Sequence, residues 1–66
     1  MNFFVIEFAG MCYDLSRQEF IGIPSSQCCF PVKSLAEQYN EEYLEGAGKI
    51  AELRVTGKSM VTRLYL

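Results

Sequence analysis

The chain has 66 residues, of which 50% are hydrophobic and 14% are aromatic, and its formal net charge is −2. This length predicts a single compact domain, 1–66, with a small core whose stability an oligomer or a partner would supplement. The hydrophobic content excludes a disordered tail, and the small charge excludes binding to nucleic acid by bulk electrostatics.

The first predicted element is a strand over "NFFVIEF", residues 2–8. Phe4 and Ile6 alternate with Phe3 and Val5, so both faces are apolar, which predicts a central strand covered on both sides, or on one side by a partner. Glu7 interrupts the apolar run, and no basic segment precedes it, which argues against a signal peptide and a membrane span. We expect a soluble cytoplasmic protein.

A turn at Ala9-Gly10 precedes "MCYDLSRQEFIGIPSS", in which we predict two short strands. The second strand, in "EFIGIP", is ended by Pro24. The polar residues 16–19 predict a hairpin loop between the two strands, and a single helical turn over 14–18 is the alternative. Residues 27–30, "QCCF", predict a loop, part of which could extend a strand.

The helix is predicted to start at Ser34, because "SLAE" has the spacing of a capping box between Ser34 and Glu37. It is expected to end near Gly46 or Gly48, where glycine can adopt the left-handed cap. On a helical wheel, one arc contains Leu35, Ala36, Tyr39, Tyr43 and Ala47. The opposite arc contains Glu37, Glu41, Glu42 and Glu45. This pattern predicts an amphipathic helix with the first arc against a sheet.

The "GKS" at residues 57–59 resembles part of a phosphate-binding loop, but residue 52, where that loop needs a glycine, is glutamate. A β-rich segment follows it instead of a helix, so we predict a hairpin with Gly57-Lys58 at the centre of a type II′ turn. The expected cross-strand pairs are Val55 with Met60, Leu53 with Thr62, Ala51 with Leu64, Glu52 with Arg63 and Ile50 with Tyr65.

Together these elements predict an α+β fold. We expect a small antiparallel sheet of about four or five short strands with one amphipathic helix packed on it, in the order β-β(-β)-α-β-β.

The chain has no histidine, the commonest general base and metal ligand, and its three cysteines are Cys12, Cys28 and Cys29. An odd number of cysteines fits reduced thiols in the cytosol better than a disulfide framework. The spacing does not supply the paired ligands of a zinc site. We therefore expect no catalytic residue, metal or cofactor, and no enzymatic activity. A thiol enzyme or redox protein using Cys28 or Cys29, near the helix start, is the alternative in that class.

Two sets of polar and aromatic residues are candidates for contacts with a partner. Glu37, Glu41 and Glu45 recur at every fourth position and form an acidic stripe that could meet a basic surface. The predicted partner-binding residues are Glu37, Glu41, Glu45, Lys58, Tyr39, Tyr43 and Tyr65. The basic residues of the last third of the chain could instead clamp a single strand together with Tyr13 and Tyr65. The predicted nucleic-acid contacts are Lys49, Arg54 and Arg63.

In size and in the order of its elements, the chain resembles several small phage-encoded inhibitors, including some anti-CRISPR proteins and small inhibitors of host polymerases. This resemblance in layout implies inhibition by occlusion of a host protein or nucleoprotein complex. We expect a non-enzymatic protein-binding module, an inhibitor from a phage or mobile element of a host defence or nucleic-acid machine, which could form a homodimer. The alternative is a small dimeric nucleic-acid-binding regulator that uses the basic C-terminal hairpin, although direct binding to nucleic acid is the less favoured reading.

Overall fold

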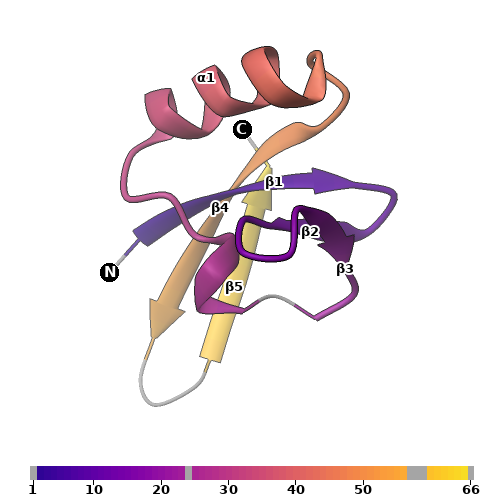
Figure 1. The fold of residues 1–66 in the computed structure, drawn as a ribbon. Helices are drawn as coiled ribbons and strands as arrows, with labels where there is room; N and C mark the ends of the chain where they lie inside the picture. The colour runs from indigo at the N-terminus through magenta and orange to yellow at the C-terminus, as the bar shows by residue number, and fades with distance from the viewer. Residues whose placement is uncertain (1, 24, 57–59, 66) are drawn as a thin grey trace.

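The structure is a computed structural model that describes residues 2–23, 25–56 and 60–65, with the backbone alone described for 55–56 and 60–65. Its elements are β1 (Asn2–Phe8), β2 (Met11–Asp14), β3 (Glu19–Ile21), the 3₁₀ turn η1 (Ser26–Cys28), α1 (Lys33–Leu44), β4 (Lys49–Thr56) and β5 (Met60–Tyr65). The strands form one antiparallel sheet in the order β3-β2-β1-β4-β5, and α1 lies across one face of it (Figure 1). The α+β class is confirmed. The predicted order of elements agrees in part, because η1 stands where a loop was expected.

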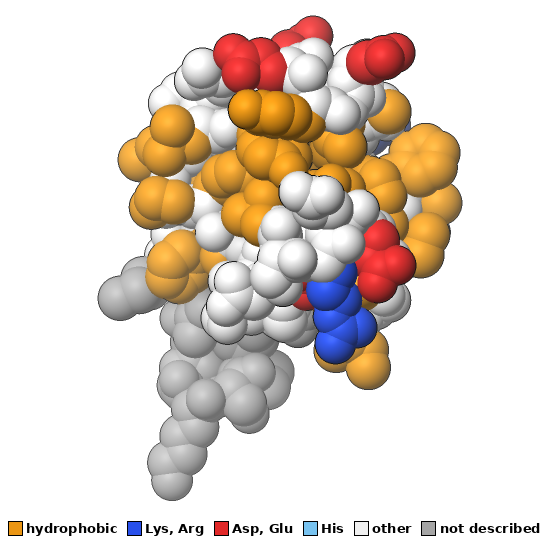
Figure 2. Space-filling view, viewed as in Figure 1, with side chains coloured by type: hydrophobic (Ala, Val, Ile, Leu, Met, Phe, Trp, Pro, Cys, Tyr) orange, Lys and Arg blue, Asp and Glu red, His pale blue; other side chains and the backbone are white. Residues whose placement is uncertain are grey.

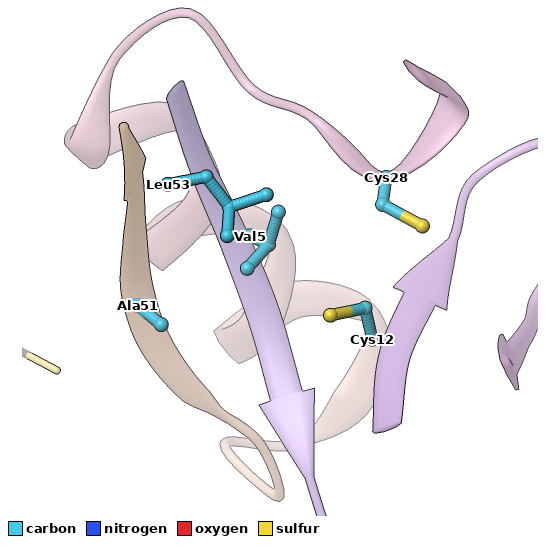
Figure 3. Packing of buried hydrophobic residues seen from close by; sticks show 5 residues of the cluster. All are labelled: Val5, Cys12, Cys28, Ala51 and Leu53. Carbon is cyan, nitrogen blue, oxygen red and sulfur yellow. The ribbon is translucent and has the colours of Figure 1, made fainter. Parts of the chain in front are cut away.

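The central strand β1 pairs with β2 on one side and β4 on the other, and it is buried on both faces. Val5 and Ile6 are adjacent in sequence, so they point to opposite faces, and both are fully buried. One core cluster contains Val5, Cys12, Cys28, Ala51 and Leu53 (Figure 3). The other contains Ile6, Tyr13, Phe30 and Ala36 and lies under α1. Of the two predicted alternatives, the structure shows cover of both faces of β1 by the chain itself, with η1 contributing Cys28 to the face away from the helix. Cover of one face of β1 by a partner, the other alternative, is not required.

The turn between β1 and β2 places two residues in the left-handed region, Ala9 at φ 52° and Gly10 at φ 78°. Because the left-handed conformation costs a non-glycine residue about 1–2 kcal/mol, we expect Ala9→Gly to raise the free energy of unfolding by about 0.5–1 kcal/mol in urea denaturation. Gly10→Ala is the control, since a Cβ at Gly10 meets no atom within 4 Å and the variant reports backbone strain alone. If Ala9→Gly lowered the free energy of unfolding, the left-handed backbone of Ala9 would not be a source of strain.

The connection between β2 and β3 combines both predicted alternatives. Residues 15–18 form the turn of a hairpin, and within it the Gln18 N–H donates to the Asp14 carbonyl at 2.8 Å, the bond of a single helical turn. Beyond η1, Phe30 forms an isolated bridge with Phe4, with hydrogen bonds of 2.9 and 2.7 Å between their backbones. Part of "QCCF" therefore extends the sheet, as the sequence allowed.

The predicted capping box is wrong. The helix begins at Lys33, and its N-cap is Val32, which is extended and makes no side-chain capping bond. Ser34 therefore lies inside the first turn, and Glu37 instead pairs with Lys33 at 3.9 Å. The predicted end near Gly46 is confirmed, but the left-handed C-cap residue is Glu45 and not a glycine, and Gly46 follows it at φ 73°. Within the described residues, no helix has the length and hydropathy that crossing a membrane requires.

The arc of α1 that faces the sheet is displaced from the predicted one. Its buried residues are Ala36 and Asn40, four positions apart. Tyr39 is half-buried, and Leu35 and Tyr43, which share the predicted apolar arc, are exposed. The exposure of Tyr43 agrees with its prediction as a partner-binding residue, whereas that of Leu35 differs from the predicted arc. Ala36 belongs to the core cluster that also contains Ile6, Tyr13 and Phe30, so the face of α1 that carries Ala36 and Asn40 is the one turned toward the sheet.

The C-terminal hairpin is present, but its register differs by one residue from the prediction. Thr56 pairs with Met60, which leaves three connecting residues instead of two. The observed pairs include Ala51 with Tyr65, Glu52 with Leu64, Leu53 with Arg63, Arg54 with Thr62 and Val55 with Val61. The predicted pairs, including Glu52 with Arg63 and Ile50 with Tyr65, are therefore wrong, because one added loop residue slips the whole register. The predicted turn at Gly57-Lys58 lies outside the described residues.

Candidate partner-binding surface

A series of aromatic rings runs from the sheet to the outer face of α1. Tyr13 packs edge-on against Phe20 at 5.1 Å between ring centroids, and it also contacts Tyr39 at 5.7 Å. Tyr39 in turn contacts Tyr43, with centroids 4.6 Å apart and planes inclined by 34°. Tyr13 is buried, Tyr39 is half-buried and Tyr43 is 66% exposed. The core thus supports an aromatic ring that is presented to solvent.

A shallow groove with a volume of about 320 Å³ surrounds the exposed end of this series. We name it the tyrosine groove, and it is lined by Phe30, Leu35, Gln38, Tyr39, Glu42 and Tyr43. Its five helical residues follow the spacing i, i+3, i+4, i+7 and i+8, which places them on one side of an α-helix. Phe30 comes from the segment before the helix and packs on Tyr39 at 5.7 Å. The groove therefore depends on the docking of α1 against the sheet.

The tyrosine groove lies in acidic surroundings. Residues 33–45 contain four glutamates and one lysine, a net charge of −3. The Gln38 side-chain amide donates to Glu42 Oε1 at 3.1 Å, which holds this carboxylate at the groove. Figure 2 shows acidic side chains along the helix, above a belt of hydrophobic side chains. Burial, followed by the neighbouring hydroxyl of Tyr13, raises the pKa of Tyr39, so its hydroxyl remains neutral at physiological pH.

The structure brings together some of the predicted partner-binding residues. Tyr39 and Tyr43 are in contact, Glu37 and Glu41 are exposed on the same helix, and Glu45 is exposed at its C-cap. The prediction missed Phe30, Leu35, Gln38 and Glu42 as groove residues. For Leu35, Gln38 and Glu42, the i, i+3, i+4 spacing with the tyrosines is the available signal. Phe30 lies before the helix, so no spacing in the sequence indicates it. Lys58 lies outside the described residues, as does the side chain of Tyr65.

The predicted nucleic-acid contacts are not brought together in the part of the chain whose side chains are described. Lys49 and Arg54 are both exposed, but they lie five positions apart in β4, so their side chains leave opposite faces of the sheet. In the antiparallel register of β4 with β1, Lys49 lies opposite Glu7 and Arg54 lies opposite Asn2. The side chain of Arg63 is outside the described set. These two cations therefore do not form one basic patch.

The cysteines lie in or beside the core. Cys12 and Cys28 are buried, and Cys29 is half-buried with its thiol directed at the Ser25 carbonyl at 3.8 Å. Burial, with a contribution from neighbouring Cys28, raises the pKa of the Cys29 thiol. A raised pKa lowers the fraction of thiolate at neutral pH, which does not favour a nucleophilic role for Cys29. Among the residues with described side chains, no three acidic or cysteine side chains gather as metal ligands.

Asp14 is a buried carboxylate whose partners close the loop after β2. Oδ1 accepts from the Ser16 hydroxyl at 2.7 Å and from the backbone N–H groups of Ser16 and Arg17, both at 2.9 Å. Oδ2 accepts from the Ser25 hydroxyl at 3.3 Å, which ties this loop to the start of η1. These hydrogen bonds satisfy both oxygens of the buried carboxylate, so the role that they indicate for Asp14 is to hold the loop in place.

We expect protein stability to fall in acid through Asp14. Its hydrogen bonds, the Ser16 hydroxyl first, lower its pKa below the ordinary 3.8, although burial opposes them. The stabilisation by Asp14 is therefore complete at a pH above the pKa of this carboxyl in the unfolded chain. It is lost as the pH falls through the lower pKa of the folded state. A ¹³C NMR titration should give Asp14 a midpoint below 3.8. Ser16→Ala should raise that midpoint, and an unchanged midpoint in this variant would contradict the assigned cause.

No protein-family model, curated protein or solved structure matches this chain.

Proposed function

We propose that the protein is a non-enzymatic protein-binding module and that the tyrosine groove, with the acidic residues of α1, is its contact surface. The observation that carries this proposal is the exposure of Tyr43 on a support of buried and half-buried rings, beside Leu35, which is 46% exposed. Tyrosines of this kind are enriched among the residues that dominate binding energy. A ring already held by its neighbours loses little conformational entropy when it binds.

The charge of the surface favours a basic partner. An acidic helix attracts a positively charged surface and accelerates its association. Basic surfaces are typical of proteins that handle nucleic acid. We therefore propose that the module acts by occlusion in the cytoplasm, as a phage or mobile-element inhibitor that covers a basic surface of a host defence or nucleic-acid machine.

A quantitative affinity capture from host lysate, followed by mass spectrometry, tests the proposal. The double variant Leu35→Ala/Tyr43→Ala removes two exposed side chains of the groove, so the fold should persist, as circular dichroism can verify. Ile23→Ala is the matched control, because Ile23 is also apolar and exposed but lies outside the groove. We expect one stoichiometric protein partner with the wild type and the control, and loss of at least about tenfold with the double variant.

Two results would contradict this function. Recovery of nucleic acid alone would favour a nucleic-acid-binding regulator, and equal capture by all three proteins would place the binding surface elsewhere. In a purified complex, charge reversal of Glu41 and Glu45 together should slow association, and added salt should reduce the difference. If the affinity of this variant for the partner were unchanged, the acidic stripe would not contribute to binding.

A further inference from the structure

We infer that the tyrosine groove binds an arginine side chain from the protein partner, with the guanidinium stacked on Tyr43 and paired with Glu42. This inference rests on the proposed function, because it specifies the chemistry of the partner at the same surface. Its basis is the combination of an exposed aromatic ring, a positioned carboxylate and an unbalanced negative charge within one groove.

The ring of Tyr43 has the exposure that stacking requires. Its contact with Tyr39, at 4.6 Å and 34°, supports it on one side, and the side chain is still 66% exposed. A cation over the face of an aromatic ring is attracted by the negative charge of the π system. Support from Tyr39 limits the motion of the ring, which reduces the entropy lost on binding.

Glu42 supplies the second half of the recognition. One carboxylate oxygen accepts from the Gln38 amide, and the other oxygen remains an acceptor beside the groove. A guanidinium is planar and carries its N–H donors at the edge, so it can stack on a ring while it donates in its own plane to a carboxylate. The ammonium of lysine is a point charge that lacks this combination of a flat face and an edge of donors.

The charge of the helix selects a cation. The net charge of residues 33–45 is −3, and Lys33 is already paired with Glu37 at 3.9 Å. A phosphate group approaching this surface would be repelled, whereas an arginine would neutralise part of its charge. Leu35 and Phe30, at the same groove, provide apolar contacts for a residue that flanks the arginine. The inferred ligand is thus an arginine next to an apolar side chain.

The test is a titration of the ¹⁵N-labelled protein with the peptide acetyl-Leu-Arg-Leu-amide, followed by NMR. We expect a dissociation constant of about 1–10 mM, because a tripeptide gains one stacked cation and one exposed ion pair. The shifts should centre on Gln38, Glu42 and Tyr43. The same peptide with citrulline, which keeps the shape and loses the charge, should bind at least about fivefold more weakly, and the lysine peptide about twofold more weakly.

Variants separate the two contacts. Tyr43→Ala and Glu42→Gln should each weaken binding of the arginine peptide about two- to fivefold. Glu19→Gln is the control for charge, because Glu19 is exposed on β3, does not line the groove and is not part of the proposed contact surface. It should leave the affinity within about 1.5-fold of the wild type, since an exposed charge outside the contact is strongly screened.

Three results would overturn the inference: no shifts at the groove at about 10 mM peptide, equal binding of the citrulline peptide, or equal weakening by Glu19→Gln and Glu42→Gln. If a protein partner were still captured through Leu35 and Tyr43, the proposed function would stand without arginine recognition. If no protein were captured either, both would fail. Dimerisation that Tyr43→Ala abolishes would replace the inferred ligand by a second copy of the chain.

Discussion

Replacing Asn40 with alanine is expected to lower the free energy of unfolding by about 2–3 kcal/mol, although alanine is the better helix former. The Asn40 Nδ2–H donates to the Gly48 carbonyl at 2.9 Å, and Oδ1 accepts from the Gly48 N–H at 3.0 Å. The variant would leave both backbone groups of Gly48 without these partners in a partly buried site, at about 1–3 kcal/mol each before water compensates for part of the loss. Urea denaturation followed by circular dichroism measures the effect.

The control for this prediction is Gln38→Ala on the same helix. Gln38 is exposed and its side chain bonds to Glu42 at the surface, so its removal should change stability by no more than about 0.5 kcal/mol. If Asn40→Ala were as stable as Gln38→Ala, the two bonds to Gly48 would not stabilise the fold. Because Asn40 fixes the end of α1 to the start of β4, we also expect its loss to weaken the tyrosine groove.

Gly48→Ala is expected to destabilise the protein by about 2 kcal/mol, because its new methyl group has no space. A Cβ at this position would overlap Ile6 Cγ2, and it would lie 3.2 Å from Asn40 Oδ1 and 3.3 Å from the Glu7 carbonyl oxygen. Ile6 is fully buried, so it has little freedom to move away. The same urea denaturation measures the loss.

Gly22→Ala is the matched control, since a Cβ at Gly22 meets no atom within 4 Å and its backbone is not left-handed. Gly22→Ala should leave the free energy of unfolding unchanged or raise it by up to about 0.4–1 kcal/mol, because alanine lowers the conformational entropy of the unfolded chain. Equal losses in both variants would show that backbone freedom, and not the contact with Ile6, is what matters. The double variant Asn40→Ala/Gly48→Ala should lose less than the sum of the two, because both changes act on one contact.

Part of the candidate surface could be read from the chain and part could not. The tyrosines and the acidic stripe of α1 were recognisable, because helical spacing puts residues three and four apart on one side. The orientation of that side was not recognisable, since Leu35 and Tyr43 are as apolar as residues that pack in a core. The buried Asn40 was missed for the converse reason: a polar side chain on a helix predicts exposure unless its partner, here Gly48, is known.

By itself, the sequence determined the short-range features: an apolar central strand, the turn at Ala9-Gly10, one helix that ends near Gly46, and a C-terminal hairpin. Each depends on alternation, spacing or backbone preference within about ten residues. Only the tertiary structure decided the rotation of α1 and the register of β4 with β5. The first depends on the packing of Ala36 in the cluster with Ile6, Tyr13 and Phe30, and the second on the pairing of Thr56 with Met60 across the hairpin. Both follow from contacts between segments, and local patterns do not encode these contacts.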